Sequence, residues 1–231
     1  VLPASAFQFS PLEQEFGATG PDSQKTYTIV NDSDDYIAVA LSAAVRDQDE
    51  EGNEVNRPAP GYFTIVPQQV LVPPRSTQPV RIQYRGPRTA TAEMAFRIIA
   101  EQRPYNQGRA AQGQGMFTFQ FTYNAAAYVL PTQKVVRVQA VSAVPTVMED
   151  GARALAITLQ NSGNVHQLLD EARMSLQDDK GRSIILADAA LARINGMNLL
   201  ARKTVTVSIP WPEDTPQDIS SLTVTSFTYT K

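Results

Sequence analysis

The most regular hydrophobic pattern in the chain lies at residues 115–124 (GMFTFQFTYN). Its apolar positions alternate with polar ones and are all aromatic: Phe117, Phe119, Phe121 and Tyr123. Successive side chains of a β-strand point to opposite faces, so this spacing predicts a strand with four rings on one face. Two interpretations are open: a half-buried strand of an ordinary sandwich, or a strand that presents its aromatic face to another protein.

Short alternating runs bounded by turn residues continue along the whole chain, and they fall into two sets on either side of residues 131–134 (PTQK). Turn signals about every 8–12 residues are typical of sandwiches. We therefore predict an all-β protein with domains at 1–131 and 132–231. The acidic stretch 47–56 (DQDEEGNEVN) is expected to be a solvated hairpin loop. The Gln-, Gly- and Arg-rich stretch 101–115 is expected to be a long mobile loop.

The composition narrows the classes of partner. The chain has 231 residues, 42% of them hydrophobic and 19% charged, with a net charge of −3. This balance is that of a globular protein and gives no reason to expect nucleic acid or an anionic membrane as partner. The absence of cysteine excludes disulfides, thiolate metal sites and a cysteine nucleophile. No apolar run approaches the roughly 18–20 residues that span a bilayer, so membrane insertion is not expected.

The sequence offers no residues for catalysis. His166 is the only histidine, and it follows a turn without a cysteine or carboxylate at metal-ligand spacing. We therefore predict a surface or turn histidine. No phosphate-binding glycine loop or hydrolase motif is present. We expect a protein that is not an enzyme and uses no cofactor or metal.

The first residues give a hint of export. Residues 1–6 read VLPASA, and Ala4, Ser5 and Ala6 have the small-x-small form of a signal-peptidase site. A flexible N-terminal lead-in is the alternative interpretation.

Residues 63–104 carry a resemblance to a known family. The run FTIVPQQVLVPPRSTQPVRI, followed by AEMAFRIIAEQRP, resembles the first domain of the PapD-like periplasmic chaperones of pilus (fimbrial) assembly. The likeness continues weakly into the second domain, where 161–163 resembles the family's asparagine turn. The resemblance implies two immunoglobulin-like sandwiches in an L or boomerang arrangement, a periplasmic location and no catalysis.

The resemblance also assigns a role to the aromatic strand. Such chaperones lend their G1 strand to an incomplete pilus subunit, a process called donor-strand complementation, and deliver the subunit to an outer-membrane usher. When Pro131 is aligned with the proline that ends G1, the donor positions fall on Phe117, Phe119 and Phe121, with Tyr123 continuing the row. An exposed strand edge of this kind also leaves self-association open.

Four other positions are carried over from the family. Arg81 and Glu93 match members of an interdomain ion-pair cluster, and Asp218 falls near the third member. Pro67 matches a proline that a cis bond often precedes. The alternative for the charged residues is a solvated strand face.

One departure from the family leaves the function open. The positions that usually bind the subunit's terminal carboxylate fall on or near Glu13 and Ala126, and neither side chain can bind a carboxylate. Either Lys25, Arg85 or Lys134 substitutes, or the protein holds its client without this anchor, or it belongs to a divergent branch with a different client. The alternative function is a secreted or surface-attached two-domain structural or adhesive protein that donates no strand.

Overall fold

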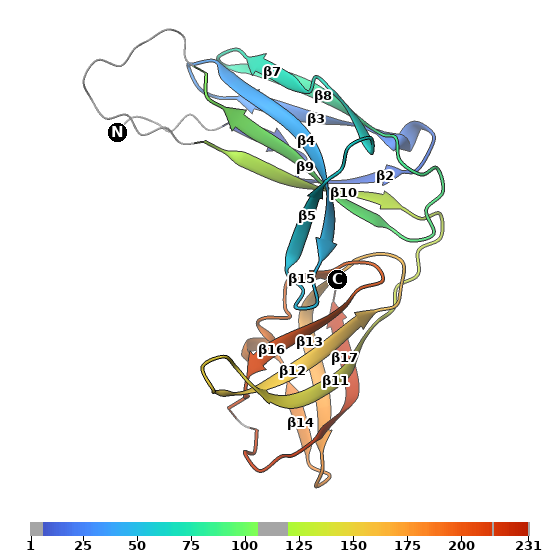
Figure 1. Ribbon diagram of the computed structural model, residues 1–231, viewed down its shortest axis with the longest axis vertical. Coiled ribbons are helices and arrows are strands. Elements are labelled where there is room, and N and C mark those ends of the chain that lie inside the picture. Colours follow the sequence, from blue (N-terminus) through green and yellow to red (C-terminus); the bar gives the residue numbers. More distant parts are fainter. Residues whose placement is uncertain (1–6, 106–119, 214, 231) are drawn as a thin grey trace, which may run out of the picture. The chain divides into compact units, whose positions relative to one another are not determined.

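The computed structural model describes residues 7–105, 120–213 and 215–230, and these form two compact units (Figure 1). No α-helix occurs among the described residues, and the prediction of an all-β, two-sandwich fold is confirmed. The chain changes units between Leu130 and Pro131. The second unit also takes up Asp47–Val55 and Thr91–Glu93, which the sequence pattern did not predict.

The first unit contains two sheets. One has the order β1-β3-β8-β6, made of β1 (Phe7–Ser10), β3 (Gln24–Asn31), β8 (Ser76–Tyr84) and β6 (Phe63–Val66). The other has the order β2-β10-β9-β4-β5, with β7 also paired to β4. Its strands are β2 (Glu13–Gly17), β10 (Thr122–Leu130), β9 (Met94–Arg103), β4 (Ile37–Gln48), β5 (Glu54–Pro58) and β7 (Gln69–Val72).

The core of the first unit follows from strand alternation. On β8, Val80 and Ile82 are fully buried while Arg81 between them is exposed. Phe96 and Ile98 of β9 enter the same core from the other sheet. Strand β9 runs on to Arg103, where it pairs with β4, so the predicted loop begins later than expected. Residues 106–115 of that predicted loop lie outside the described residues.

The second unit also contains two sheets. One has the order β11-β12-β16, made of β11 (Val138–Val147), β12 (Arg153–Asn161) and β16 (Thr204–Pro210). The other is built on β13 (Gln167–Asp178), which pairs with β14 (Ser183–Leu186), β15 (Met197–Leu199) and β17 (Leu222–Thr230). The alternating Leu155, Ile157 and Leu159 of β12 pack with apolar side chains of β13 in one core. The alanine-rich stretch after β14 forms only a short 3-10 helix, η2 (Asp188–Leu191).

A buried asparagine closes an equivalent turn in each unit. The Asn31 side-chain amide donates to three carbonyls, those of Asp35, Val72 and Pro73, at 2.8–3.1 Å. Asn161 does the same with three carbonyls of its own unit, those of Val165, Leu199 and Leu200, at 2.9–3.2 Å. Both residues are at most 1% exposed. The two units therefore use the same device to fix the end of a strand, which supports the similarity between them.

The hairpin tip between β4 and β5 is less solvated than its acidic sequence suggested. Within the second unit, the Gln48 amide donates to the Asn198 carbonyl (2.9 Å), and its oxygen accepts from the Leu200 N–H (2.8 Å). The Glu50 carbonyl accepts from the Thr206 N–H (2.7 Å). The prediction of a solvated hairpin loop is confirmed for Glu50, Glu51 and residues 53–56, which are exposed, whereas Gln48 is buried by its partners in the second unit.

Candidate functional site

The start of the described chain leaves one edge of the first unit incompletely paired. Strand β1 pairs with β3 in one sheet, and β2 pairs in parallel with β10 in the other. Between them the Ser10–Pro11 peptide bond is cis. The β2 ladder covers only Ala126–Leu130, whereas β9 follows β10 along Thr122–Val129. In the described part of the chain, the first residues of β10 thus have a strand on one side only (Figure 1).

Thr122 and Asn124 of β10 direct their backbone groups to this open edge, as the bonds of the neighbouring residues show. The Ala126 N–H donates to the Leu12 carbonyl at 2.7 Å, on the side of β2. The Phe121 carbonyl accepts from the Gln102 N–H at 2.9 Å, on the side of β9. Because backbone groups alternate sides along a strand, Thr122 and Asn124 point the same way as Ala126, away from β9. No described strand pairs with them there, which makes this edge a template for an added strand.

The aromatic row is only partly described. Phe121 and Tyr123 are half-buried and pack against the core of the first unit. The Tyr123 hydroxyl donates to the Phe7 carbonyl, and the two rings meet edge to face at 4.9 Å. Tyr123 therefore contributes to the protein's own core, a contact with β1 that no local pattern signals. Phe117 and Phe119 lie outside the described residues.

The two positions expected at the carboxylate anchor are direct neighbours in the sheet. Ala126 is the register partner of Glu13 on one side and of Arg97 on the other. Their side chains share the outer face of the sheet, because Ala125 and Ala127 belong to the core. The Arg97 guanidinium donates from Nη1 to the Asn124 carbonyl at 3.3 Å. A basic group thus lies at the open edge, but it comes from β9, which the sequence did not suggest.

The basic residues considered as substitutes are placed elsewhere. Lys25 lies on β3 in the other sheet and pairs with Asp22 at 3.1 Å. Arg85 follows β8 and donates to the Thr64 hydroxyl at 3.2 Å. Lys134 belongs to the second unit.

Glu93 has a partner other than the expected one. Its two carboxylate oxygens each lie 2.8 Å from the ring nitrogen Nδ1 of His166. The backbone N–H of His166 also donates to one of these oxygens, at 3.3 Å. Both residues are buried and belong to the second unit. His166 lies in the turn before β13, as one of the two expectations had it, but it is not a surface side chain, because Glu93, far away in sequence, supplies a buried partner for the ring.

Asp218 also has partners of its own. Its carboxylate pairs with Lys180, and with Arg182 at 2.9 Å. Hydrogen bonds from Lys180 and then from Arg182 lower the pKa of Asp218 below its usual value. Within the second unit, Glu93 and Asp218 therefore belong to two separate groups of charges. Arg81 lies on the exposed face of β8.

The peptide bond before Pro67 is cis. Pro67 directly follows β6 and precedes β7, where the chain crosses from one sheet to the other. This is the proline that the family resemblance singled out.

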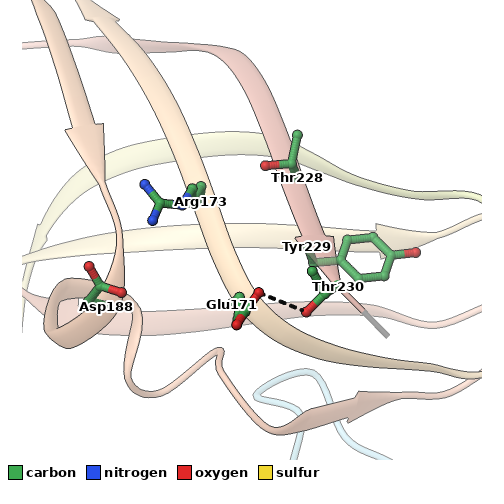
Figure 2. Close-up of a pocket in the computed structure, with 6 residues that line it drawn as sticks. All are labelled: Glu171, Arg173, Asp188, Thr228, Tyr229 and Thr230. Atoms are coloured by element: carbon green, nitrogen blue, oxygen red, sulfur yellow. Dashed lines mark hydrogen bonds between the residues drawn. The ribbon is translucent and has the colours of Figure 1, made fainter.

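Other regions offer little chemistry. Figure 2 shows a shallow pocket on the second unit, where the Tyr229 ring points away from Arg173 and Asp188. In this pocket the Thr230 hydroxyl donates to the Glu171 carboxylate at 3.4 Å. Among the described residues, no three His, Cys, Asp or Glu side chains gather as a metal site. The same part of the chain contains no helix with the length and hydrophobicity that a membrane crossing requires.

Comparison with known proteins relates this geometry to a fold. No family model matches the chain, and no curated relative matches its sequence. Among solved structures, the class 5 fimbriae chaperone CfaA superposes with a TM-score of 0.60 at 11% identity, over 95% of this chain and 98% of that one. The chain has the fold of the fimbrial chaperones. The resemblance to the PapD-like chaperones is thereby confirmed at the level of the fold.

Two further structures show the same fimbrial-chaperone fold. A chain of the Salmonella enterica SafA pilin–SafB chaperone complex has a TM-score of 0.58 at 12% identity, over 91% of this chain and 86% of that one. The third structure is a chain of the CsuC–CsuE chaperone–tip adhesion subunit complex, from the archaic chaperone-usher Csu pili of Acinetobacter baumannii. It has a TM-score of 0.55 at 12% identity, over 89% of this chain and 91% of that one.

Proposed function

We propose that this protein is a periplasmic chaperone that binds pilus or fimbrial subunits by donor-strand complementation and hands them to an outer-membrane usher. The observation that carries the proposal is the open edge of β10 at Thr122 and Asn124, on the strand that continues the aromatic row. The fold agrees with this role, since solved complexes of the same fold join a chaperone to a pilin or a tip adhesion subunit.

The proposed binding combines two physical effects. A subunit strand added at the edge would accept from the backbone N–H groups of Thr122 and Asn124, which gives affinity with little dependence on sequence. The rings of Phe117, Phe119 and Phe121 would enter the apolar gap of an incomplete subunit. Full burial of each such ring is worth about 1.5–3 kcal/mol. We propose that Tyr123 ends the row, because it also packs on Phe7 of its own unit.

Several finer statements belong to this proposal. The protein would act without catalysis, its partners would be a pilus subunit and an usher, and it would work after export. Arg81, Glu93 and Asp218 would act on the stability of their own units, given the local partners of Glu93 and Asp218. Self-association through the β10 edge would compete with subunit binding.

The variant Phe119→Asp tests the proposal. We expect it to abolish capture of a pilus subunit, because an unpaired carboxylate would enter an apolar site. Circular dichroism should remain that of the unmodified protein. Thr118→Asp is the matched control, since the same charge would lie on the polar face of the strand, and it should retain capture.

The opposite pattern would support the structural or adhesive alternative. If Phe119 belongs to the core of its own sandwich, Phe119→Asp would unfold the first unit. Capture of the subunit by folded Phe119→Asp would also overturn the proposal.

A further inference from the structure

We propose that two copies of this chain associate through β14, whose outer edge pairs with the same edge of the second copy in an antiparallel arrangement centred on Ile185. The inference goes beyond the proposed function and does not depend on it, because it uses no residue of the β10 edge. It concerns the second unit alone, to which all of β14 belongs.

Strand β14 lies at the edge of its sheet. It pairs with β13 on one side, from Ser183 opposite Gln177 to Leu186 opposite Met174. Among the described residues, no strand pairs with its other side, and no turn or loop bonds to the backbone of these four residues. An edge of this kind offers its N–H and C=O groups to an added strand.

The other sheet of the second unit shows how an edge can be protected from such pairing. Strand β11 has a bulge and a proline, Pro145, which lacks a backbone N–H. At β16 the Thr206 N–H already donates to the Glu50 carbonyl. Strand β14 reads Ser-Ile-Ile-Leu and has no bulge, proline or charge. Only its short length limits the pairing of its edge.

Ile185 is the side chain that a second copy would cover. It is 72% exposed, although Ile184 and Leu186 beside it are buried. Its register partner on β13 is Ser175, which pairs in turn with Ser226 of β17. Neither serine is large enough to shield it. A β-branched side chain in this setting gains from an apolar partner directly opposite it across a pair of strands.

The sequence around Ile185 is complementary to an antiparallel copy of itself. In a two-fold contact, residues equally far from the axis face each other. With Ile185 on the axis, the two Ile185 side chains meet, and Arg182 lies opposite Asp188 of the second copy. Arg182 donates to Asp178 from Nε and to Asp218 from Nη2, while its Nη1 has no partner among the described residues. Two symmetric ion pairs add little energy at an exposed site, but they favour this register over a shifted one.

Sedimentation equilibrium of the full chain tests the inference. We expect the average mass to rise with protein concentration, from the mass of one chain toward twice that mass. Ile185→Lys and Ile185→Glu should each remain monomeric, because like charges would lie directly opposite each other. An equal mixture of the two variants should associate again, because each Lys would then face a Glu. Only a contact in which position 185 meets itself predicts this rescue.

A control variant separates this edge from a general loss of apolar surface. Val147→Lys changes a comparably exposed apolar residue on β11 and should associate as the unmodified protein does. Circular dichroism of both Ile185 variants should match that of the unmodified protein, because the side chain is exposed.

Three results would overturn the inference. The unmodified protein could remain monomeric at every concentration, which would leave the β14 edge to a strand of another protein. The mixture of Ile185→Lys and Ile185→Glu could stay monomeric. Association could also survive in Ile185→Lys alone, which would place the contact at another edge, such as β10. None of these results would affect the proposed function.

Discussion

At the residue scale, the most specific information lies in polar side chains buried among backbone groups. Asn161 can be suspected from sequence because it stands in a turn before Gly163, and Asn31 begins a similar Asx-rich turn. Two of the three carbonyl partners of each asparagine lie 38–42 residues away in the sequence, so no local pattern could identify them. The same reason explains His166, whose partner Glu93 lies 73 residues away. Sequence shows that such a group is present but not what satisfies it.

Replacement of Asn161 should reveal the cost of leaving these groups unsatisfied. Asn161→Ala removes the donor to three carbonyls, and we expect a loss of about 1–3 kcal/mol in the free energy of unfolding of the second unit. Urea denaturation measures this loss. Gln139→Ala, at an exposed position of β11, is the control and should change stability by less than about 0.5 kcal/mol. Similar stabilities for the two variants would show that the buried amide is not needed.

At the element scale, the alternation of apolar and polar residues predicted where the strands lie, but not which strands pair with one another. The positions of β8, β9 and β12 follow from their apolar spacing. The switch of the first strands from one sheet to the other does not, because it depends on pairing with β3 and β10 across the sandwich. That switch creates the open edge, so the aromatic strand could be found from sequence, while the edge without a neighbouring described strand could not.

The hairpin between β13 and β14 should make the second unit sensitive to acid. Burial acts to raise the pKa of Asp178, but hydrogen bonds from the Arg182 side chain and from the Arg182 and Lys180 backbone outweigh it and lower that pKa. The pKa of Asp218 is lowered by Lys180 and Arg182. Lowered values mean that both carboxylates stabilise the fold above their unfolded pKa of about 3.9, and that this stability is lost as the pH falls through the lower folded values.

Urea midpoints measured at pH 7 and at pH 3 check this expectation. The unmodified protein should lose stability between pH 7 and pH 3. Asp218→Asn should lose less, because the side chain at this position no longer takes up a proton as the pH falls. An identical loss in both proteins would show that Asp218 contributes nothing to the acid response.

At the scale of the whole molecule, the sequence predicted two sandwiches but not which segments each unit recruits. The stretch 47–55 reads as a solvated loop because it is acidic, yet the structure assigns it to the second unit. Composition could not show this, because the partners lie far away in sequence: Gln48 bonds to Asn198 and Leu200, and Asp47 forms an ion pair with Lys203.

Gln48→Ala tests this assignment. The Leu200 N–H would lose its acceptor, so its amide hydrogen should exchange faster with solvent. The change should correspond to a decrease of about 1 kcal/mol in the free energy of local opening. Hydrogen exchange followed by NMR measures the change. Asn53→Ala, at the same hairpin tip, provides the control. Unchanged exchange at Leu200 would mean that the hairpin tip does not support the second unit.

The most direct test of strand addition at β10 is amide hydrogen exchange at Thr122 and Asn124, with and without a bound pilus subunit. These two N–H groups point to the open edge, so pairing with a subunit strand should protect both of them strongly. The amides of Tyr123 and Ala125, which already face β9, should change little. If a subunit binds and protection at Thr122 and Asn124 stays at the level of the free protein, the subunit does not add its strand at this edge and the proposed mechanism is wrong.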